Sequence, residues 1–218
     1  RVSELLQQSK RCIYPDDEIY ERMGRLSGEA LNHNRRFRTE VQLQNSSGQI
    51  FWVDANAAQI TDTDSVWIFV DVEAHKKRQK EIEYQATHDA LTGLPNRRLV
   101  IAQIKQSIAL ADRDQGTVAA CFIDLDGFKS VNDTYGHDAG DIVLQTIAER
   151  LNSAVRSHDC VARLGGDEFV VVLTGKNNRE NAVGIMQRCL DMVQIPIMVE
   201  DGHAAMVGCS IGIAYYVG

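Results

Sequence analysis

Two short apolar runs separated by a Gly–Gly pair constrain the fold more than any other feature of this sequence. Residues 161–164 and 169–173 are largely apolar, and Gly165 and Gly166 lie between them. Glycine adopts positive φ angles at no steric cost, so this pattern predicts a β-hairpin. The acidic residues at 167–168 would lie at its tip.

A second apolar run, residues 117–126, ends in two carboxylates. Asp124 and Asp126 are two positions apart, so they project from the same face if the strand extends that far. Clustered carboxylates need a compensating positive charge, and Mg²⁺ is commonly held by one or two carboxylates together with substrate phosphates. Each acidic pair also has an ordinary interpretation, as a solvated strand end or a polar turn. Their joint occurrence favours a metal site.

The distribution of charge agrees with carboxylates that bind metal. Residues 1–80 contain 12 basic and 12 acidic side chains and residues 81–218 contain 11 and 18, so the whole net charge of −7 lies in the second part. This part lacks the basic stripe expected of a nonspecific nucleic-acid binder, so we expect no nucleic-acid partner. An acidic domain accommodates a nucleoside triphosphate only where metal ions and local donors offset the repulsion, which again favours carboxylates that bind metal.

The first third of the sequence predicts one helix and three antiparallel strands. Apolar and polar residues alternate along the first strand, which places Phe37, Val41 and Leu43 on one face. The predicted elements are a helix from 15 towards 31, strands at 37–43, 50–60 and 66–72, and turns at 45–48 and 61–64. One helix and three strands make a thin core for an independent domain.

This part of the sequence resembles the C-terminal half of a PAS domain. The resemblance is carried by the segments 37–41 (FRTEV), 47–48 (SG), 51–53 (FWV) and 68–72 (IFVDV). It implies a partial PAS domain over residues 1–72, a sensory or dimerising module whose ligand the sequence does not specify.

Residues 73–88 predict a helical linker, because they are rich in Lys, Glu, Gln and Arg and contain neither Gly nor Pro. Its apolar positions, Val72, Ile82 and Ala86, are too sparse for a long coiled-coil seam. A plain exposed helix and a short dimer-forming helix both fit this composition.

The sequence contains no apolar stretch of about 18 residues and no signal-peptide pattern, which predicts no membrane segment in this chain. Its 5 cysteines are scattered without a CxxC pair, so neither a disulfide scaffold nor a zinc site is expected. These features favour a reducing, cytoplasmic location. Because the first residue is Arg1 rather than methionine, membrane attachment through an upstream segment stays open.

Four segments of the remaining sequence resemble, in order, the motifs of the GGDEF diguanylate cyclase family. They are 89–97 (DALTGLPNR), 124–129 (DLDGFK), 132–141 (NDTYGHDAGD) and 165–169 (GGDEF). The resemblance covers residues 88–218. It implies an α+β domain at 89–218 with a central antiparallel sheet flanked by helices, similar to nucleotidyl-cyclase and polymerase palm domains, preceded by the helical linker and the partial PAS domain.

Carried over residue by residue, the family pattern implies a metal site and a base. Asp124, Asp167 and the carbonyl of Leu125 would hold Mg²⁺ or Mn²⁺. Glu168 would be a further acidic ligand or would help to deprotonate the nucleophile. The sequence leaves open which of Asp167 and Glu168 acts as the base.

The same resemblance implies nucleotide-binding residues. Asn132 and Asp141, which we expect in a loop, match the guanine-binding positions, and an Asp acceptor suits the N1 and N2 donors that adenine lacks as a pair. Phe128 and Lys129 match phosphate contacts made through backbone amides and an ammonium group. A solvated surface position is the ordinary alternative for Lys129.

The implied activity is condensation of two GTP molecules into cyclic di-GMP with release of pyrophosphate. Each chain would hold one GTP, so a homodimer is expected, with the PAS part and the linker controlling whether the half-sites meet. Two alternatives stay open. One is a GTP- or cyclic di-GMP-binding regulatory module without turnover, which could be part of a GGDEF–EAL phosphodiesterase, and the other is a PAS-driven sensor or dimerisation protein.

Arg156 and Asp159 form an RxxD pattern just before the hairpin, the place of the product-binding inhibitory site in that family. An Arg fork and a carboxylate suit the guanine edges and phosphates of cyclic di-GMP. On its own, RxxD is ordinarily a surface ion pair worth ~0–1 kcal/mol. The family continues after a strand at 209–216 with a phosphate-binding helix, which we expect to be missing from a sequence that stops at Gly218.

Overall fold

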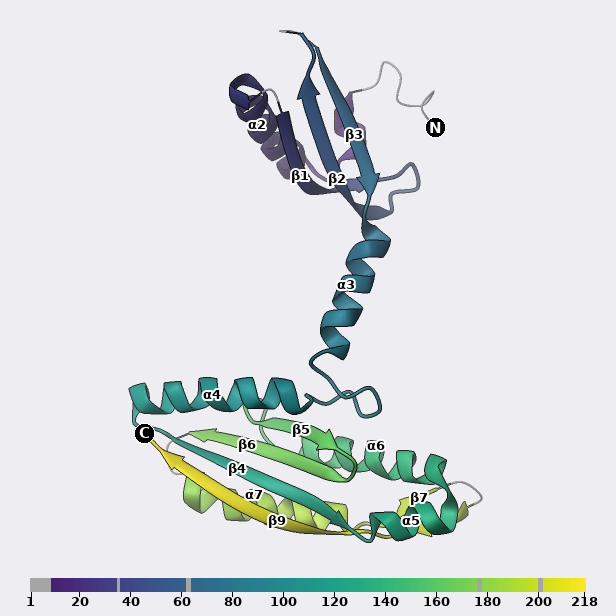
Figure 1. Ribbon diagram of the computed structural model, residues 1–218, viewed down its shortest axis with the longest axis vertical. Helices are drawn as coiled ribbons and strands as arrows, with labels where there is room; N and C mark the ends of the chain where they lie inside the picture. Colours follow the sequence, from purple (N-terminus) through teal and green to yellow (C-terminus); the bar gives the residue numbers. More distant parts are fainter. Residues whose placement is uncertain (1–8, 35, 62–63, 176–177, 200–201) are drawn as a thin grey trace. The chain divides into compact units, whose positions relative to one another are not determined.

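The computed structural model describes residues 9–34, 36–61, 64–175, 178–199 and 202–218. The chain forms two compact units, Arg1–Ile82 and Glu83–Gly218 (Figure 1). Within the described ranges, no helix is both long enough and apolar enough to cross a membrane.

The first unit is a three-stranded antiparallel sheet with helix α2 packed on it, as the alternation of residues predicted. Its elements are η1 (Lys10–Ile13), α2 (Asp17–Asn34), β1 (Arg36–Gln44), β2 (Ile50–Gln59) and β3 (Ser65–Asp71), in the sheet order β1-β2-β3. Val41, Leu43 and Val53 are buried against Tyr14 and Met23. The turn predicted at 45–48 is present, with Gly48 N–H donating to the Asn45 carbonyl. Of the turn predicted at 61–64, residues 62–63 lie outside the described residues.

Helix α3 (Glu73–Gln85) forms where a helical linker was predicted, and its first turn is fastened to the sheet of the first unit. The Glu73 carboxylate accepts the Trp52 backbone N–H at 3.0 Å. Lys76 forms an ion pair with Glu40, and its ammonium group lies 4.3 Å from the centre of the Trp52 ring. No described side chain of α3 is buried, and Ile82 is 66% exposed.

The second unit is a mixed α+β domain around a central antiparallel sheet with the strand order β5-β6-β4-β9, and the predicted fold class is confirmed for this unit. The hairpin predicted around Gly165 and Gly166 is formed by β5 and β6. The elements are α4 (Arg97–Asp114), β4 (Thr117–Asp126), α5 (Phe128–Tyr135), α6 (His137–Ala154), β5 (Cys160–Gly165), β6 (Glu168–Gly175), α7 (Asn178–Val193), β7 (Ile197–Met198), β8 (Ala204–Ala205) and β9 (Gly208–Val217).

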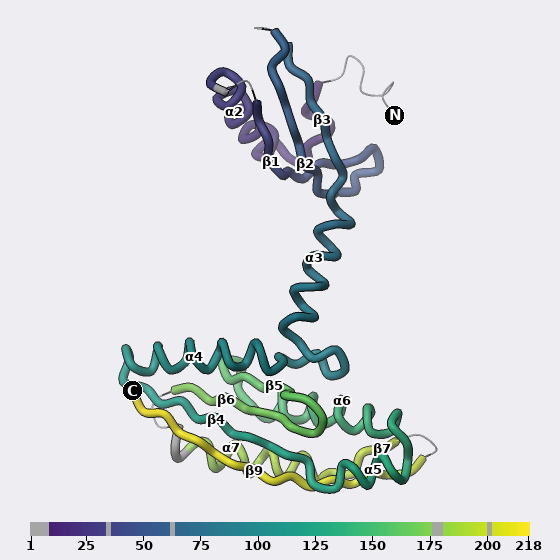
Figure 2. Tube along the Cα trace, viewed as in Figure 1, coloured from purple at the N-terminus to yellow at the C-terminus, as the bar shows by residue number. Residues whose placement is uncertain are grey.

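Helices cover both faces of this sheet. Helix α4 packs on one face through Val100 and Ala111, which contact Val118 and Val170. Helices α6 and α7 pack on the other face, around the fully buried Phe169. The trace in Figure 2 shows the end of β9 beside the start of β4, in agreement with their antiparallel register and the hydrogen bond from Gly218 N–H to the Gly116 carbonyl.

The prediction of a loop over residues 132–141 was wrong, because this segment lies in two helices that meet at Gly136. Helix α5 carries Asn132 and helix α6 carries Asp141. Polar residues with low helix propensity suggested a loop, but burial of Val131, Ala139 and Val143 against the core outweighs that preference. Gly136, with φ 85°, makes the sharp change of direction between the helices.

Arg163 joins the hairpin to the segment before α4. Its guanidinium donates two hydrogen bonds to the Gly166 carbonyl, at 3.0 and 2.8 Å, and one to Asp89 at 2.9 Å. Its backbone N–H donates to the Pro95 carbonyl at 3.0 Å. The Arg163 and Asp89 side chains are only 10% and 22% exposed, so this ion pair is largely removed from water.

The carboxylate of Asp89 is held in its charged form. Burial alone would raise the pKa of Asp89, but hydrogen bonds from Thr92 and Arg163 outweigh burial and leave the pKa below its ordinary value. A carboxylate whose pKa is lower in the folded state stabilises the fold above its ordinary pKa, and this contribution is lost as the pH falls through the lowered value.

Arg163→Met should lower the free energy of unfolding by about 2–4 kcal/mol, because it leaves Asp89 and the Gly166 carbonyl without their partner. The value is measured by urea denaturation at neutral pH. The matched control is Arg98→Met, which changes an exposed arginine of α4 and should stay within about 0.5 kcal/mol of the wild type. Equal stability of both variants would contradict the structural role of Arg163.

Candidate active site

The tip of the β5–β6 hairpin presents two acidic residues, as the sequence predicted. Gly165 and Gly166 have φ angles of 140° and 56°, which favour glycine, and the register of the hairpin shifts at this point. Glu168 is exposed and Asp167 is half-buried. Because Arg163 holds the Gly166 carbonyl, the turn that carries these acids is fixed from inside the fold.

Asp124 lies directly opposite Glu168 in the antiparallel pairing of β4 and β6. Direct cross-strand partners have Cβ atoms about 4.5–5.5 Å apart and share one face of the sheet. On the other side of Asp124, the direct partner is Ser210 of β9. A row of three oxygen-bearing side chains therefore crosses the sheet at the exposed end of its strands.

The backbone joins two further positions to this row. The Leu125 N–H donates to the Asp167 carbonyl at 3.3 Å, so Asp167, in the turn before β6, lies beside the positions of β4 that were predicted to bind metal. Asp126 projects from the same face as Asp124 and accepts hydrogen bonds from the Ser210 hydroxyl at 3.1 and 3.0 Å.

The donor set at this edge fits Mg²⁺. Within the described residues, the side chains form no preassembled group of three or more metal-ligating residues. Mg²⁺ usually takes only one or two carboxylates and completes its coordination with water and substrate phosphates. Asp124 and Glu168, side by side and exposed, with Asp167 and a backbone carbonyl nearby, offer that kind of incomplete oxygen site.

A basic side chain, that of Arg97, faces the acidic tip of the hairpin. Arg97, the first residue of α4, has its Nη2 atom 3.7 Å from Oε2 of Glu168. Arg97, Asp124, Glu168 and Ser210 line a hollow of about 630 Å³ on this face. In the sequence, Arg97 belongs to the motif at 89–97 without an assigned role, since nothing in its spacing shows that α4 begins beside the hairpin.

The residues predicted to bind guanine lie where α5 meets α6. Asn132 of α5 packs against Gly140 of α6, and a Cβ atom added at Gly140 would lie 1.9 Å from the Asn132 Oδ1 atom. Gly140 therefore makes room for the Asn132 side chain, next to Asp141. This role of Gly140 has no signal in the sequence, because it follows from the packing of two helices.

The residues predicted to bind phosphate open helix α5. Phe128 and Lys129 are its first two residues, after Gly127 in a left-handed conformation. The first N–H groups of a helix have no partner within the helix, so these amides can donate to a ligand. Phe128 packs against the core while Lys129 is exposed.

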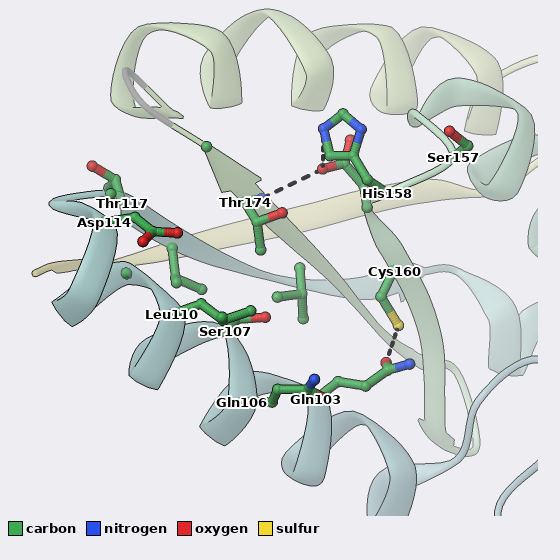
Figure 3. Close-up of a pocket in the computed structure, with 16 residues that line it drawn as sticks. Gln103, Gln106, Ser107, Leu110, Asp114, Thr117, Ser157, His158, Cys160 and Thr174 are labelled. Carbon is green, nitrogen blue, oxygen red and sulfur yellow. Dashed lines mark hydrogen bonds and ion pairs between the residues drawn. The ribbon is translucent and has the colours of Figure 1, made fainter.

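The RxxD residues lie at the opposite end of the hairpin from the acidic tip. Arg156 is exposed, whereas the Asp159 side chain is only 2% exposed and accepts the backbone N–H groups of Arg156 at 3.1 Å and Thr174 at 3.4 Å. Asp159 thus shapes the turn itself. Figure 3 shows the cavity beside this turn, with His158 and Thr174 on one side and Ser107 and Leu110 of α4 on the other.

Relatives of this chain are known from Pseudomonas aeruginosa. The bifunctional diguanylate cyclase/cyclic di-GMP phosphodiesterase MucR is 41% identical over 142 residues, which cover 65% of this chain and 20% of MucR. The diguanylate cyclase TpbB is 41% identical over 135 residues, which cover 62% of this chain and 31% of TpbB. This chain therefore spans less than a third of the length of either relative.

Solved structures of GGDEF domains resemble this chain as well. A truncated form of TpbB that comprises only the GGDEF domain aligns with a TM-score of 0.58 and 41% identity, covering 59% of this chain and 75% of that one. The GGDEF domain of DgcB from Caulobacter crescentus, solved in complex with c-di-GMP, aligns with a TM-score of 0.56 and 26% identity, covering 60% of this chain and 78% of that one.

A sequence model of one family matches most of the second unit. It is described as "Diguanylate cyclase, GGDEF domain" and matches residues 86–218, which is more than half of the chain. This range contains the acidic hairpin, the strand that carries Asp124 and the α5–α6 pair. The PAS assignment of residues 1–72 lies outside the match and stays a prediction. From residue 86 onward, the motifs, the fold and the relatives agree, and the chain belongs to the GGDEF diguanylate cyclase family.

Proposed function

We propose that the second unit is one half-site of a diguanylate cyclase, which converts two GTP molecules into one cyclic di-GMP and two pyrophosphates. The observation that carries this proposal is the placement of Asp124 and Glu168 as direct cross-strand neighbours on an exposed face beside the Gly–Gly turn. In each of two steps, the 3′-oxygen of one GTP bonds to the α-phosphorus of the other. The bond from that phosphorus to the pyrophosphate leaving group breaks.

The acidic row would hold the metal and receive the proton. Asp124, Asp167 and the Leu125 carbonyl would bind Mg²⁺, or Mn²⁺ in its place. When bound, the metal lowers the pKa of the attacking hydroxyl and offsets the charge that develops on the phosphoryl oxygens. Either Glu168 or Asp167 would accept the proton of the 3′-hydroxyl, and Glu168 would otherwise be a further metal ligand.

The two helices beyond the row would hold the rest of the nucleotide. Asn132 and Asp141 suit guanine, because an amide pairs with O6 or N7 and a carboxylate accepts from N1 and N2. The N-terminal amides of α5 and the Lys129 ammonium group suit the phosphates.

The proposed reaction requires two chains, since one half-site holds one GTP and the product contains two nucleotides. A homodimer with two-fold symmetry would bring two acidic rows together. We further propose that residues 1–72 form a partial PAS module and that the linker at 73–88 transmits its state to the half-sites. The fastening of Glu73 and Lys76 to the sheet of the first unit supports this role, because a change in that sheet would move the start of α3.

Product feedback is proposed at Arg156 and Asp159. In this arrangement, Arg156 is the exposed group that would contact cyclic di-GMP, and Asp159 holds the turn that presents it.

Asp124→Asn should reduce cyclic di-GMP formation at least about a hundredfold, because it removes a charge from the proposed metal site at nearly constant size. Activity is measured by incubating the purified chain with GTP and Mg²⁺ and separating the nucleotides by chromatography. Asp133→Asn, an exposed acid of α5 outside the row, is the control and should retain activity. Full activity of the Asp124 variant would refute the assignment of Asp124 as a metal ligand. A dimeric wild type that binds GTP without forming cyclic di-GMP would refute the proposed cyclase activity.

Gly140→Ala should weaken nucleotide binding by about tenfold, because the new methyl group displaces the Asn132 amide from its place. Affinity is measured by calorimetry with Mg²⁺ and 3′-deoxy-GTP, which lacks the nucleophile and does not react. Gly184→Ala in α7 is the control, since nothing lies within 4 Å of an added Cβ atom there. It should bind normally. Unchanged affinity of a folded Gly140 variant would argue against guanine binding by Asn132.

Arg156→Ala should abolish inhibition by cyclic di-GMP while leaving initial activity and thermal stability near the wild type, because Arg156 is exposed. Asp159→Ala should also lower the melting temperature, since it removes the acceptor of two backbone N–H groups. Initial rates at increasing product concentration test the first expectation. Normal inhibition of the Arg156 variant by cyclic di-GMP would contradict the proposal of a feedback site at this turn.

A further inference from the structure

The position of Arg97 is fixed by the start of α4. The Asn96 side chain accepts the backbone N–H groups of Arg98 and Leu99, at 3.0 and 3.2 Å, and so caps the helix. Asn96 is itself tied to the preceding segment by hydrogen bonds to the carbonyls of Thr87 and His88. Because Arg163 holds the neighbouring Pro95 carbonyl, the first turn of α4 lies beside the hairpin and directs Arg97 towards Glu168.

Stability does not account for an arginine at this place. A cation in the first turn of a helix opposes the helix dipole, and α4 has no acidic residue in that turn. The Arg97–Glu168 pair is 3.7 Å long, with the two side chains 64% and 55% exposed. Exposed pairs of this kind contribute little to folding. In the described part of the chain, the Arg97 guanidinium donates no hydrogen bond, so its five donors are available to a ligand.

The charges around the hollow indicate which ligand those donors would meet. Among the described residues that line the hollow, Arg97 is the one basic residue, and it shares this lining with Asp124 and with its ion-pair partner Glu168. A metal held by these acids would draw substrate phosphates to the same place, because phosphates complete such a coordination shell. A guanidinium beside them is suited to bidentate binding of phosphate oxygens.

We infer that Arg97 binds the phosphates of the nucleotide in the candidate active site, exchanging its contact with Glu168 for phosphate oxygens when the nucleotide enters. The inference rests on the proposed function, since it takes GTP as the ligand. It assigns to α4 a cationic contact in addition to Lys129 of α5, and it explains how an acidic edge of the sheet accepts a triphosphate.

The test compares ligands with and without phosphates. Calorimetry with 3′-deoxy-GTP and Mg²⁺ on the full chain should show that Arg97→Ala weakens binding about ten- to a hundredfold, the range expected for charge-assisted hydrogen bonds. Binding of guanosine, followed by NMR titration because it is weak, should change less than about twofold. Arg97→Lys should retain part of the affinity for 3′-deoxy-GTP, and Arg98→Ala, the neighbouring exposed arginine, should retain all of it.

A double-variant cycle separates phosphate binding from an action through Glu168. If Arg97 contacts phosphate directly, Arg97→Ala should weaken binding of 3′-deoxy-GTP in a Glu168→Gln background as well. Loss of the effect in that background would overturn the inference, as would an equal loss of guanosine binding or an unchanged affinity of Arg97→Ala. If one of these contradicting results were found while the wild type still synthesised cyclic di-GMP, only the proposed role of Arg97 would be refuted. A wild type that binds neither 3′-deoxy-GTP nor guanosine would overturn the proposed function as well.

Discussion

The buried guanidinium of Arg163 is the interaction on which the candidate site depends. Through Gly166 it holds the turn that carries the acids, and through Asp89 and Pro95 it holds the segment from which α4 starts. A largely buried ion pair is tolerated only when its hydrogen-bonding groups are satisfied. Here the Arg163 guanidinium donates to the Gly166 carbonyl and to Asp89, and the Arg163 backbone N–H donates to the Pro95 carbonyl. The hairpin tip and the first turn of α4 therefore have a common anchor.

Along β4 of the central sheet, buried residues that pack in the core alternate with exposed residues of the candidate site. In β4, Ile123 and Leu125 are buried against α6 and α7, while Asp124 and Asp126 between and after them are exposed. A shift of one residue in the register would bury the acids and expose the core, so the same pairing that forms the core also aligns Asp124 with Glu168. Arg97 reaches this face because α4 packs on the same face of the sheet, against Val118 of β4.

The nucleotide half of the site depends on a close approach of two helices rather than on strand pairing. Burial of Val131 and Ala139 draws α5 and α6 together, and Gly140 leaves the space that Asn132 occupies. The sequence motif identified Asn132 and Asp141 as candidates, but their polar neighbours suggested a loop. Local propensity failed here because tertiary burial of a few apolar residues outweighs several weak preferences.

The sequence by itself determined the elements whose signals are local: the hairpin at Gly165 and Gly166, the strand at 117–126 that carries Asp124, and the helix of the linker. Two-residue alternation and glycine conformation act over a few positions, so they can be followed along the chain. Only the tertiary structure decided which distant residues meet. Asp89 and Arg163 are 74 positions apart, and neither this pair nor the approach of Arg97 to Glu168 has a signal in spacing. Such contacts arise when helices pack on a sheet, because the geometry of packing, and not the order of residues, sets the distances between their side chains.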